Sequence, residues 1–450
     1  MRDEGQRSTW KALAAALVGA LFAGTGALLF AFFDLGSTRL AAFVWSEAPW
    51  AVFVIMPLGL GVILWLRDNY FLWTDGTGIP QTIAALQSGP GALRDRLLSL
   101  RVAAGKAILT GLGLFSFLSI GREGPSVQLG ACVMQFVSKW TSFPRHLAER
   151  GLILGGGAAG IAAAFNAPVA GIVFSFEEIG RRFDKENLGT IVRTVVVACL
   201  VACAVLGNYF FYGRVEFDRI VPIEFTAPGP WVAVLVIGAA GGLLGGLFAK
   251  VLLWIAPPVK RAIRRQPWLV ALGIGTACAV VVWASDGAAL GTGYAQARSL
   301  ILQDSPEYLA TLPADEVAAM DVTRAKVGPW YALQRAAATM LVLATGIPGG
   351  LFDPSFSVGA GLGHVTAPWL AVTGASIQGI ILLWVAAYFS GVVQSPMTSF
   401  IILIEMTGAI SFTLPLAAAS IVAYEVSRRV CPVALYEALA GEFLKSGPDK

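Results

Sequence analysis

Apolar runs follow one another along almost the whole chain, and this pattern leaves little room for a water-soluble core. The first run extends from Ala12 to Phe33, and later ones include Ile191–Phe211 and Trp231–Ile255. Only 13% of the residues are charged, whereas soluble domains carry about 25%. A chain of this kind needs lipid around it. The sequence therefore predicts an all-α, polytopic membrane protein with a single domain over residues 1–450.

Several of the apolar runs are too short to cross a bilayer as straight helices. Ile377–Phe389 and Phe400–Met406 fall short of the roughly 20 apolar residues that a straight span needs, and Gly or Pro lies within or beside them. Broken helices are tolerated in a membrane only where protein or a water-filled cavity covers the backbone. We therefore expect helices that tilt, stop partway or re-enter. The polar stretch Gln303–Val327 is expected to be a surface connection.

Basic residues gather beside some of the apolar runs. Because positive residues favour the cytoplasmic side of a membrane, these clusters and both termini are expected to face the cytoplasm. No basic stripe interleaved with aromatic residues points to nucleic acid. The clusters are Arg2, Arg7 and Lys11 before the first run, Arg94, Arg96, Arg101 and Lys106 after the second, and Lys260, Arg261, Arg264 and Arg265 between two later ones.

Two blocks of sequence recur at nearly one offset. Pro125–Ala131 aligns with Pro354–Ala360 at an offset of 229 residues, and Asn166–Glu177 aligns with Gln394–Glu405 at an offset of 228. In each half a Gly-rich turn opens a helix, and a later Pro-led helix carries a glutamate. Corresponding interrupted helices in two repeats point to a substrate site between them. The expected halves cover residues 12–211 and 231–445.

Three Gly/Pro turns stand beside apolar helices, at Gly76–Pro80, Gly121–Pro125 and Gly349–Pro354. Pro suits the first turn of a helix, and Gly lets the chain turn sharply and present its amides. Free N–H groups and the positive end of the helix dipole together attract an anion. One such turn taken alone is more often an ordinary helix start. Three in one membrane chain, two of them on the repeat, predict a cage for an anion.

With these motifs the chain resembles the CLC family of chloride channels and transporters from about Thr74 to Leu439. The resemblance is carried by GTGIP at 76–80, GREGP at 121–125, FNAP at 165–168, GGLFDP at 349–354, SPMTSFIILIEMTG at 395–408 and ALYEAL at 434–439. It implies the inverted two-repeat fold of that family, in its bacterial form without C-terminal CBS domains. It also implies a homodimer in a bacterial inner membrane that moves chloride and protons and needs no cofactor or metal.

The resemblance also assigns a set of chloride-binding residues. The family holds its central chloride with a serine hydroxyl in the first turn, a tyrosine hydroxyl near the C-terminus, and backbone amides. Here the serine position is Thr77, which keeps a hydroxyl donor; fluoride-exporting relatives often carry Met there, so Thr77 favours chloride over fluoride. The expected chloride-binding residues are Thr77, Ile79, Gly124, Leu351, Phe352 and Tyr436.

Glu123 is the strongest single candidate for a functional side chain. An acidic residue in a membrane helix is costly and functional by default. It stands at a helix start, among amides suited to an anion, so its ionised carboxylate can compete with chloride and its protonation can release the site. The resemblance makes it the gating glutamate. The alternative is a salt bridge with Arg122, although adjacent helical residues do not face each other.

Glu178 matches the family's internal proton-transfer glutamate, although its position also fits a solvated helix end with charge pairs. Channel-type relatives generally lack this carboxylate. Its presence favours proton-coupled chloride antiport over a passive voltage- or pH-gated chloride channel. Glu405, the repeat mate of Glu177, is expected to be structural. Asp353 departs from the family pattern, and we expect it to cap its own helix.

An intramembrane enzyme is the alternative from another class of protein. Such an enzyme needs a nucleophile with a base, or a metal cluster. Neither HExxH nor GxSxG occurs in the sequence. The sequence therefore predicts a transport protein rather than an enzyme.

Overall fold

The computed structural model describes residues 2–139, 145–182, 185–215 and 228–445, with side chains described for all of these except 2–13 and 145–148. Within this part of the chain every regular element is a helix, and a single isolated backbone bridge is the only strand-like pairing. The prediction of an all-α chain is therefore confirmed. The basic residues expected before the first apolar run lie outside the described side chains.

The elements follow the apolar runs and the Gly/Pro breaks of the sequence. Up to residue 215 they are α1 (Arg2–Glu47), η1 (Pro49–Ala51), α2 (Val52–Asn69), α3 (Ile79–Ser88), α4 (Ala92–Leu97), α5 (Leu100–Phe115), α6 (Glu123–Ser138), α7 (Arg145–Phe165), α8 (Pro168–Phe174), η2 (Ser175–Ile179) and α9 (Leu188–Leu206). From residue 228 to the end of α15 they are α10 (Pro228–Arg265), α11 (Pro267–Ala284), α12 (Tyr294–Ile301), α13 (Pro306–Leu309), α14 (Ala314–Ala325) and α15 (Tyr331–Ala344). The last are α16 (Phe352–Leu370), η3 (Ala371–Thr373), α17 (Ile377–Val393), α18 (Pro396–Thr407), η4 (Ile410–Phe412), α19 (Thr413–Val430) and α20 (Leu435–Lys445).

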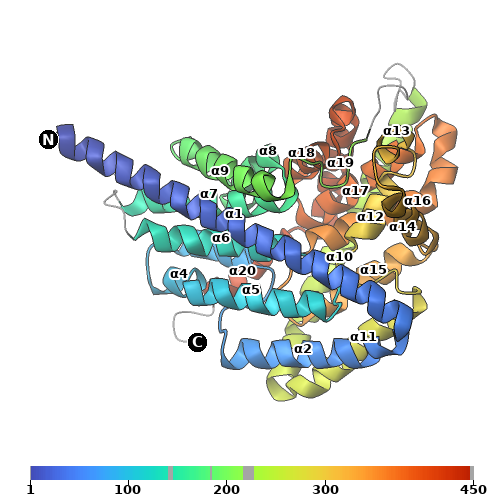
Figure 1. Cartoon of the computed structure of the whole chain (residues 1–450), viewed down its shortest axis with the longest axis horizontal. Coiled ribbons are helices and arrows are strands. Elements are labelled where there is room, and N and C mark those ends of the chain that lie inside the picture. The colour runs from blue at the N-terminus through green and yellow to red at the C-terminus, as the bar shows by residue number, and fades with distance from the viewer. Residues whose placement is uncertain (1, 140–144, 183–184, 216–227, 446–450) are drawn as a thin grey trace.

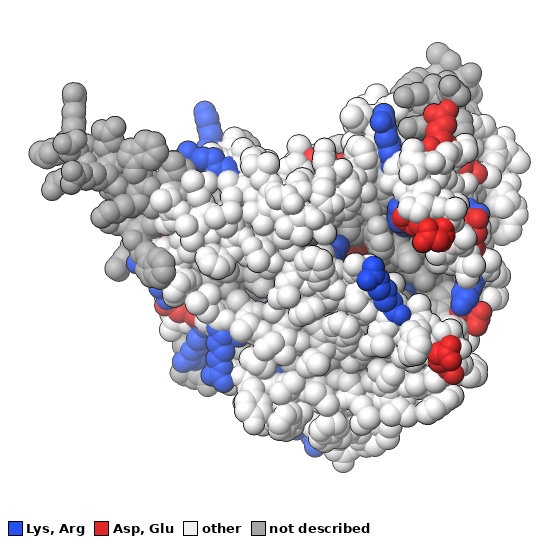
Figure 2. Space-filling view, viewed as in Figure 1, with Lys and Arg blue, Asp and Glu red and all other residues white. Residues whose placement is uncertain are grey.

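The outside of the helix bundle is suited to lipid. Seven stretches of the described chain are long and apolar enough to cross a membrane. Large apolar side chains stand exposed on them, among them Phe43, Leu200 and Trp254, at 63%, 63% and 78% exposure. Figure 2 shows one face of the molecule that is dominated by uncharged side chains. An exposed apolar surface of this extent belongs in a bilayer, and the chain is an integral membrane protein.

The long helices enclose short and broken ones. In Figure 1, α1 runs obliquely across the molecule, and α2 lies beside α11 at its lower edge. Between the long helices lie α3, with 10 residues, and α8, with 7 residues, each too short to span a bilayer. The start of α3 is buried, and the N–H groups of Val169 and Ala170 at the start of α8 are bound by Glu405, so the backbone donors of these short helices are covered or paired. The expected re-entrant architecture is confirmed.

The stretch 303–327 lies at the surface, as expected, but it is not an irregular loop. It contains α13 and α14, and neither helix has a buried residue. Polar residues stand among its alanines, and acidic residues lie in the first turn of α14, where the helix dipole favours them. The apolar spacing used to find membrane helices gives no sign of a short polar helix of this kind.

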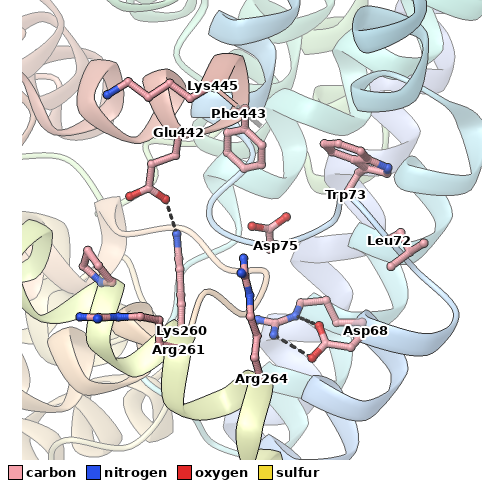
Figure 3. Close-up of a pocket in the computed structure, with 12 residues that line it drawn as sticks. Asp68, Leu72, Trp73, Asp75, Lys260, Arg261, Arg264, Glu442, Phe443 and Lys445 are labelled. Carbon is pink, nitrogen blue, oxygen red and sulfur yellow. Dashed lines mark hydrogen bonds and ion pairs between the residues drawn. The ribbon is translucent and has the colours of Figure 1, made fainter. Parts of the chain in front are cut away.

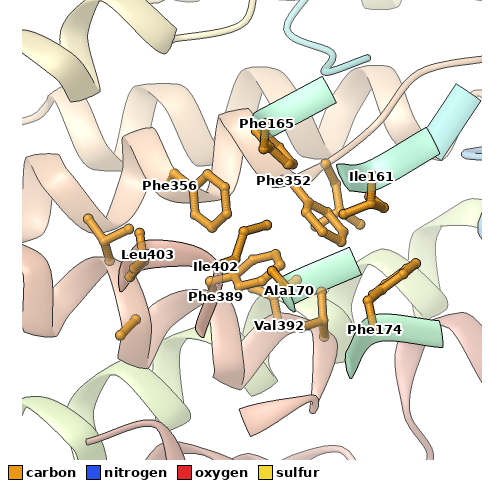
Figure 4. Packing of buried hydrophobic residues seen from close by; sticks show 14 of the residues in the cluster. Ile161, Phe165, Ala170, Phe174, Phe352, Phe356, Phe389, Val392, Ile402 and Leu403 are labelled. Atoms are coloured by element: carbon orange, nitrogen blue, oxygen red, sulfur yellow. The ribbon is translucent and has the colours of Figure 1, made fainter. Parts of the chain in front are cut away.

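A cluster of phenylalanines joins elements from both sequence repeats, as Figure 4 shows. Phe352 and Phe356 of α16 both pack on Phe389 of α17, with ring centroids 4.6 Å apart in each pair. From the other half, Phe174 meets Phe352 at 5.8 Å and Phe165 meets Phe356 at 6.0 Å. Edge-to-face aromatic pairs add about 0.5–1.5 kcal/mol each beyond burial of their area. The cluster therefore fixes the start of α16 against the first half of the chain.

Candidate functional site

The three Gly/Pro turns begin three helices in the interior of the protein. α3 begins at Ile79, α6 at Glu123 and α16 at Phe352, each where the sequence predicted a helix start. All three of these residues are fully buried. The first N–H groups of a helix have no partner within that helix. Each start therefore presents unpaired amide donors, together with the positive end of a helix dipole, inside the protein.

Two of the turns are joined directly. The N–H of Gly121 donates to the carbonyl of Gly350 at 2.7 Å, and the N–H of Gly350 donates to the carbonyl of Gly121 at 2.6 Å. These two residues are repeat mates, and they form the isolated antiparallel bridge of the fold. The bridge brings the start of α6 next to the start of α16. The expected convergence of these two turns is confirmed.

The third turn packs against the second through its backbone. Gly78 has a φ of 107° and lies so close to α6 that an added Cβ would stand 2.5 Å from the carbonyl oxygen of Gly124. A Cβ on Gly124 would meet the carbonyl oxygen of Thr77 at 2.4 Å. Only glycine permits this approach. The turn is also tied to the second half, because the N–H of Gly76 donates to the carbonyl of Gly346 at 2.8 Å.

The two hydroxyl groups expected at the chloride site are both buried and lack a hydrogen-bond partner among the described residues. Thr77 is 4% exposed and Tyr436 is 0% exposed. Tyr436 stands on α20, which packs against α3, and it lies within electrostatic range of both Glu123 and Glu178. Buried hydroxyls normally have a hydrogen-bond partner, because burying a hydroxyl without one costs about 1–3 kcal/mol. Two unpaired donors beside three helix starts fit an anion.

The four expected amide donors also lie at these helix starts. Leu351 is the N-cap of α16 and Phe352 its first residue, while Ile79 is the first residue of α3. Gly124 follows Glu123 in the first turn of α6. None of these amides has an acceptor in the preceding turn of its own helix. A halide needs only donors without a fixed geometry, which amides and hydroxyls supply.

Glu123 occupies this region with its own carboxylate. The side chain is 0% exposed, and its Oε1 accepts from the N–H of Asp353 at 3.3 Å, within the first turn of α16. Its Oε2 has no partner among the described residues. A carboxylate held by an amide at a helix start lies where an anion would bind. This placement agrees with a carboxylate that competes with chloride.

The alternative partner of Glu123 points elsewhere. Arg122 donates from Nη2 to the carbonyl of Ala164 at 3.3 Å, and its guanidinium carbon lies 5.6 Å from the ring centroid of Phe211. Arg122 is 5% exposed, so its charge still acts on this region through a poorly solvated interior. The direct salt bridge considered from the sequence does not describe the contacts of Glu123.

Asp353 does not cap its own helix, which corrects the expectation from the sequence. It lies inside α16, and both of its carboxylate oxygens lack a hydrogen-bond partner among the described residues. It is 0% exposed. The Glu123 carboxylate from α6 takes the place of the expected cap. It reaches the first turn of α16 and accepts the N–H of Asp353. Sequence spacing alone does not reveal a competitor from another helix.

Glu178 lies in the η2 segment that follows α8, within electrostatic range of Tyr436. It is 1% exposed, so the solvated helix end considered from the sequence is wrong. The hydroxyl of Ser395 donates to its Oε2, and Arg181 lies 4.0 Å from its Oε1. Arg181 also pairs with Glu437, the neighbour of Tyr436. Ser395 begins the Pro-led helix of the second half, and the sequence analysis did not single it out.

Two buried basic residues that the sequence analysis did not assign to the site hold the turns in place. Lys106 is fully buried and donates to the carbonyl of Gly76. Arg67 donates from Nη1 to the carbonyls of Thr345 and Gly346, at 2.9 and 3.1 Å. From the sequence, Lys106 belongs to the basic cluster that is expected to face the cytoplasm. Its place one turn after Val102 and Ala103, within an apolar run, was the available sign of burial.

A cavity of about 870 Å³ adjoins the first turn. Figure 3 shows Asp75, which directly precedes Gly76, facing it beside Arg264 of α10. Lys260 of α10 and Glu442 of α20 line the same cavity and form an ion pair at 2.7 Å. Charged side chains, including Asp75, Lys260 and Arg264, therefore line a cavity next to the turn that carries Thr77. Part of this lining comes from the basic cluster expected to face the cytoplasm.

These features define a membrane protein that gathers the starts of broken helices, two unpaired hydroxyls and two buried glutamates around a common interior region. The chain matches the voltage gated chloride channel family over residues 58–428, and it belongs to that family.

Individual relatives agree with this assignment. The chain is 26% identical over 386 residues to the H⁺/Cl⁻ exchange transporter ClcA of Vibrio parahaemolyticus, covering 82% of this chain and 75% of the relative. It is 29% identical over 434 residues to a chloride/fluoride channel protein of Pseudomonas syringae pv. tomato, covering 93% and 84%.

Solved structures share the fold. A slow cyanobacterial Cl⁻/H⁺ antiporter superposes with a TM-score of 0.78 at 20% identity, covering 97% of this chain and 99% of the other. A CLC-type fluoride/proton antiporter superposes with a TM-score of 0.73 at 24% identity, covering 96% and 97%. At these identities the likeness establishes the CLC fold.

Proposed function

We propose that this protein exchanges chloride for protons across a membrane. The observation that carries the proposal is the placement of the Glu123 carboxylate. It is fully buried, accepts an amide at the start of α16 and keeps one oxygen without a partner. Ionised, the carboxylate takes the place of an anion. Protonated, it loses that electrostatic attraction, and chloride can replace it.

Chloride is the proposed anion because of the donors around it. Thr77 and Tyr436 contribute buried hydroxyls, and Leu351 and Phe352 contribute amides at the start of α16. Ile79 and Gly124 complete the set from the other two turns. The ClcA relative is named as a transporter that exchanges H⁺ and Cl⁻. These donors bind a halide without placing a full positive charge against it.

Glu178 supports antiport over the passive channel that is the alternative. A buried carboxylate in a membrane protein is functional by default. Glu178 lies beside Tyr436 with Ser395 and Arg181 as neighbours, separate from Glu123. In this proposal Glu123 exchanges protons with the outside and Glu178 with the inside. A passive chloride channel needs only one of the two.

The setting of the proposal is a bacterial inner membrane with both termini in the cytoplasm. The protein forms a homodimer in which each subunit carries its own pathway, built from halves at about 12–211 and about 231–445. Lipid surrounds it, and neither nucleic acid nor a cofactor takes part. The basic side chains around the cavity beside Asp75 support this orientation, because positive residues favour the cytoplasmic face.

Reconstituted vesicles with a chloride gradient and recorded pH test the proposal. Chloride moving down its gradient should drive protons the opposite way, and the voltage of zero net current should shift with an imposed pH gradient. Glu123→Gln should stop proton movement while chloride flux persists. Glu425→Gln, which changes an exposed glutamate on α19, is the matched control and should keep both fluxes. No proton movement in the parent protein would leave a passive channel as the function.

Vesicles loaded with fluoride in place of chloride test the choice of anion. We expect chloride to support the larger proton flux, because Thr77 supplies a hydroxyl where it adjoins α6. A larger proton flux with fluoride would contradict chloride as the main substrate.

A further inference from the structure

Asp353 and Glu123 face each other from two helix starts. Glu123 is the first residue of α6, and Asp353 is the second residue of α16. The backbone bridge between Gly121 and Gly350 holds the two starts together. The N–H of Asp353 donates to Glu123 Oε1 at 3.3 Å, so the backbone of one acid binds the side chain of the other.

The side chains of the two acids lack other partners. Asp353 is 0% exposed, and neither of its carboxylate oxygens has a hydrogen-bond donor among the described residues. Glu123 Oε2 also lacks a donor among them. The two carboxyl groups nevertheless act on each other electrostatically across the joined helix starts. Two ionised carboxylates offer only acceptors to each other, whereas a protonated one can donate. A single proton between them satisfies both groups.

The charges around the pair also favour one retained proton. The groups that act electrostatically on Asp353 or feel its charge are Glu123, Arg122, Asp34 of α1 and the hydroxyl of Tyr212. Arg122 is the only cation in this set, and its charge is shared with Asp34. Of two carboxyl groups that share a buried site, only one ionises readily. One positive charge does not offset three negative ones in a poorly solvated interior.

We propose that Glu123 and Asp353 form a proton-sharing pair, in which Asp353 keeps a proton while Glu123 carries the charge that competes with chloride. This inference rests on the proposed antiport and adds a second proton-binding group to it. With one proton the pair has a charge of −1, and the Glu123 carboxylate binds the backbone amides at the start of α16. When a hydronium ion from the outer solution delivers a second proton, an O–H bond forms on Glu123, water is left, and the neutral pair admits chloride.

Chloride binding at different pH values in a Glu123→Gln background tests this pair. If Glu123 were the only titrating group, chloride affinity in this variant would be the same at every pH. If Asp353 also titrates, its ionised form repels chloride beside the amides of Leu351 and Phe352. The chloride Kd should then rise with pH, approaching about tenfold per pH unit above the midpoint for one linked proton. A Kd that stays constant from about pH 5 to pH 9 would overturn the proposal.

A second pair of variants identifies the titrating group. Adding the isosteric Asp353→Asn to Glu123→Gln should abolish the remaining pH dependence, to less than about twofold per unit. The matched control adds Asp34→Asn instead; Asp34 is a buried acid of the same cluster that faces Arg122, and this variant should keep the pH dependence. Loss of the pH dependence with Asp34→Asn but not with Asp353→Asn would assign the proton to Asp34 and refute the pair.

These outcomes are distinct from a failure of the antiport proposal. Equilibrium chloride binding requires no transport, so the pH dependence can be measured even in a protein that moves no protons. Absence of coupled flux with a pH-dependent Kd in Glu123→Gln would refute antiport and leave the pair intact. Coupled flux with a constant Kd would do the reverse.

Discussion

Glu177, in the η2 segment that directly follows α8, caps the start of α18, and Glu405 of α18 caps the start of α8. Glu177 accepts from the N–H groups of Met397 and Thr398, at 2.9 and 2.7 Å, at the start of α18. Glu405, near the end of α18, accepts from the N–H groups of Val169 and Ala170, at 3.0 and 2.7 Å, at the start of α8. The η2 end of the first segment therefore lies at the start of α18, the end of α18 lies at the start of α8, and the two segments run antiparallel. Repeat mates that exchange the same contact indicate an approximate two-fold axis between them.

Removing either cap should destabilise the protein without stopping transport outright. Charge-assisted hydrogen bonds contribute about 1.5–3 kcal/mol, and each glutamate satisfies two amides at the start of a short helix. Glu177→Gln and Glu405→Gln should each lower the thermal unfolding temperature of the purified protein. Asp321→Asn, which breaks an exposed ion pair with Arg324, is the control and should change little. Equal unfolding temperatures in all three variants would contradict a capping role.

The repeat made much of this arrangement predictable from the sequence. The offset of 228 residues between the Pro-led blocks paired Glu177 with Glu405, and Glu405 was expected to be structural. The offset of 229 paired the turn at Gly121 with that at Gly350, which the structure joins by a backbone bridge. Gly and Pro at fixed places also located the starts of α3, α6 and α16, because they act through local backbone geometry.

Contacts made between the halves were harder to predict. The cap expected for Asp353 depends on which group reaches the start of α16 first, and that group comes from α6. The donor to Glu178 is Ser395, which lies 217 residues away in the chain. The repeat gave no help there, because the mates of Glu178 and Ser395 are Met406 and Ala167. Glu178, the proposed internal proton-transfer residue, therefore lies where the two halves differ.

Removing a hydroxyl from the chloride site should weaken chloride binding. Thr77 and Tyr436 are buried donors without partners among the described residues. Each hydroxyl can therefore donate to chloride without first breaking another hydrogen bond. A hydrogen bond to a charged group contributes about 1.5–3 kcal/mol, which predicts a rise of at least about tenfold in the chloride Kd for Thr77→Val or Tyr436→Phe. Calorimetric titration measures this. Tyr424→Phe, on α19 beside Arg428, should leave the Kd unchanged.

Glu178→Gln should uncouple proton movement from chloride movement. The side chain is 1% exposed and lies apart from Glu123, so its loss removes a proton carrier but no chloride ligand. We expect proton flux to fall at least about tenfold while chloride flux continues. A side chain positioned to accept and release a proton typically accelerates a proton-transfer step by about 10²–10⁴, and the variant lacks that side chain. Ser395→Ala, which removes only the hydroxyl donor to Glu178, should lower proton flux less. Full coupling in Glu178→Gln would exclude Glu178 from the proton pathway.

Gly350→Ala should displace the Glu123 carboxylate from the start of α16. An added Cβ would stand 1.9 Å from Glu123 Oε2 and 3.0 Å from its backbone nitrogen. The nearest clash is with the end of a flexible side chain, so the carboxylate can move while the bridge to Gly121 persists, at a cost of about 1–3 kcal/mol for overpacking.

The displaced carboxylate of Gly350→Ala would no longer compete with chloride at the amides of α16. Proton flux should therefore fall relative to chloride flux, and chloride should bind with less dependence on pH. Gly273→Ala is the matched control, because a Cβ on that α11 residue meets nothing within 4 Å. Alanine favours a helix over glycine by up to about 1 kcal/mol, so Gly273→Ala should be as stable as the parent or more so and keep its coupling. Unchanged coupling in Gly350→Ala would show that the contact between Glu123 and the start of α16 does not control proton exchange.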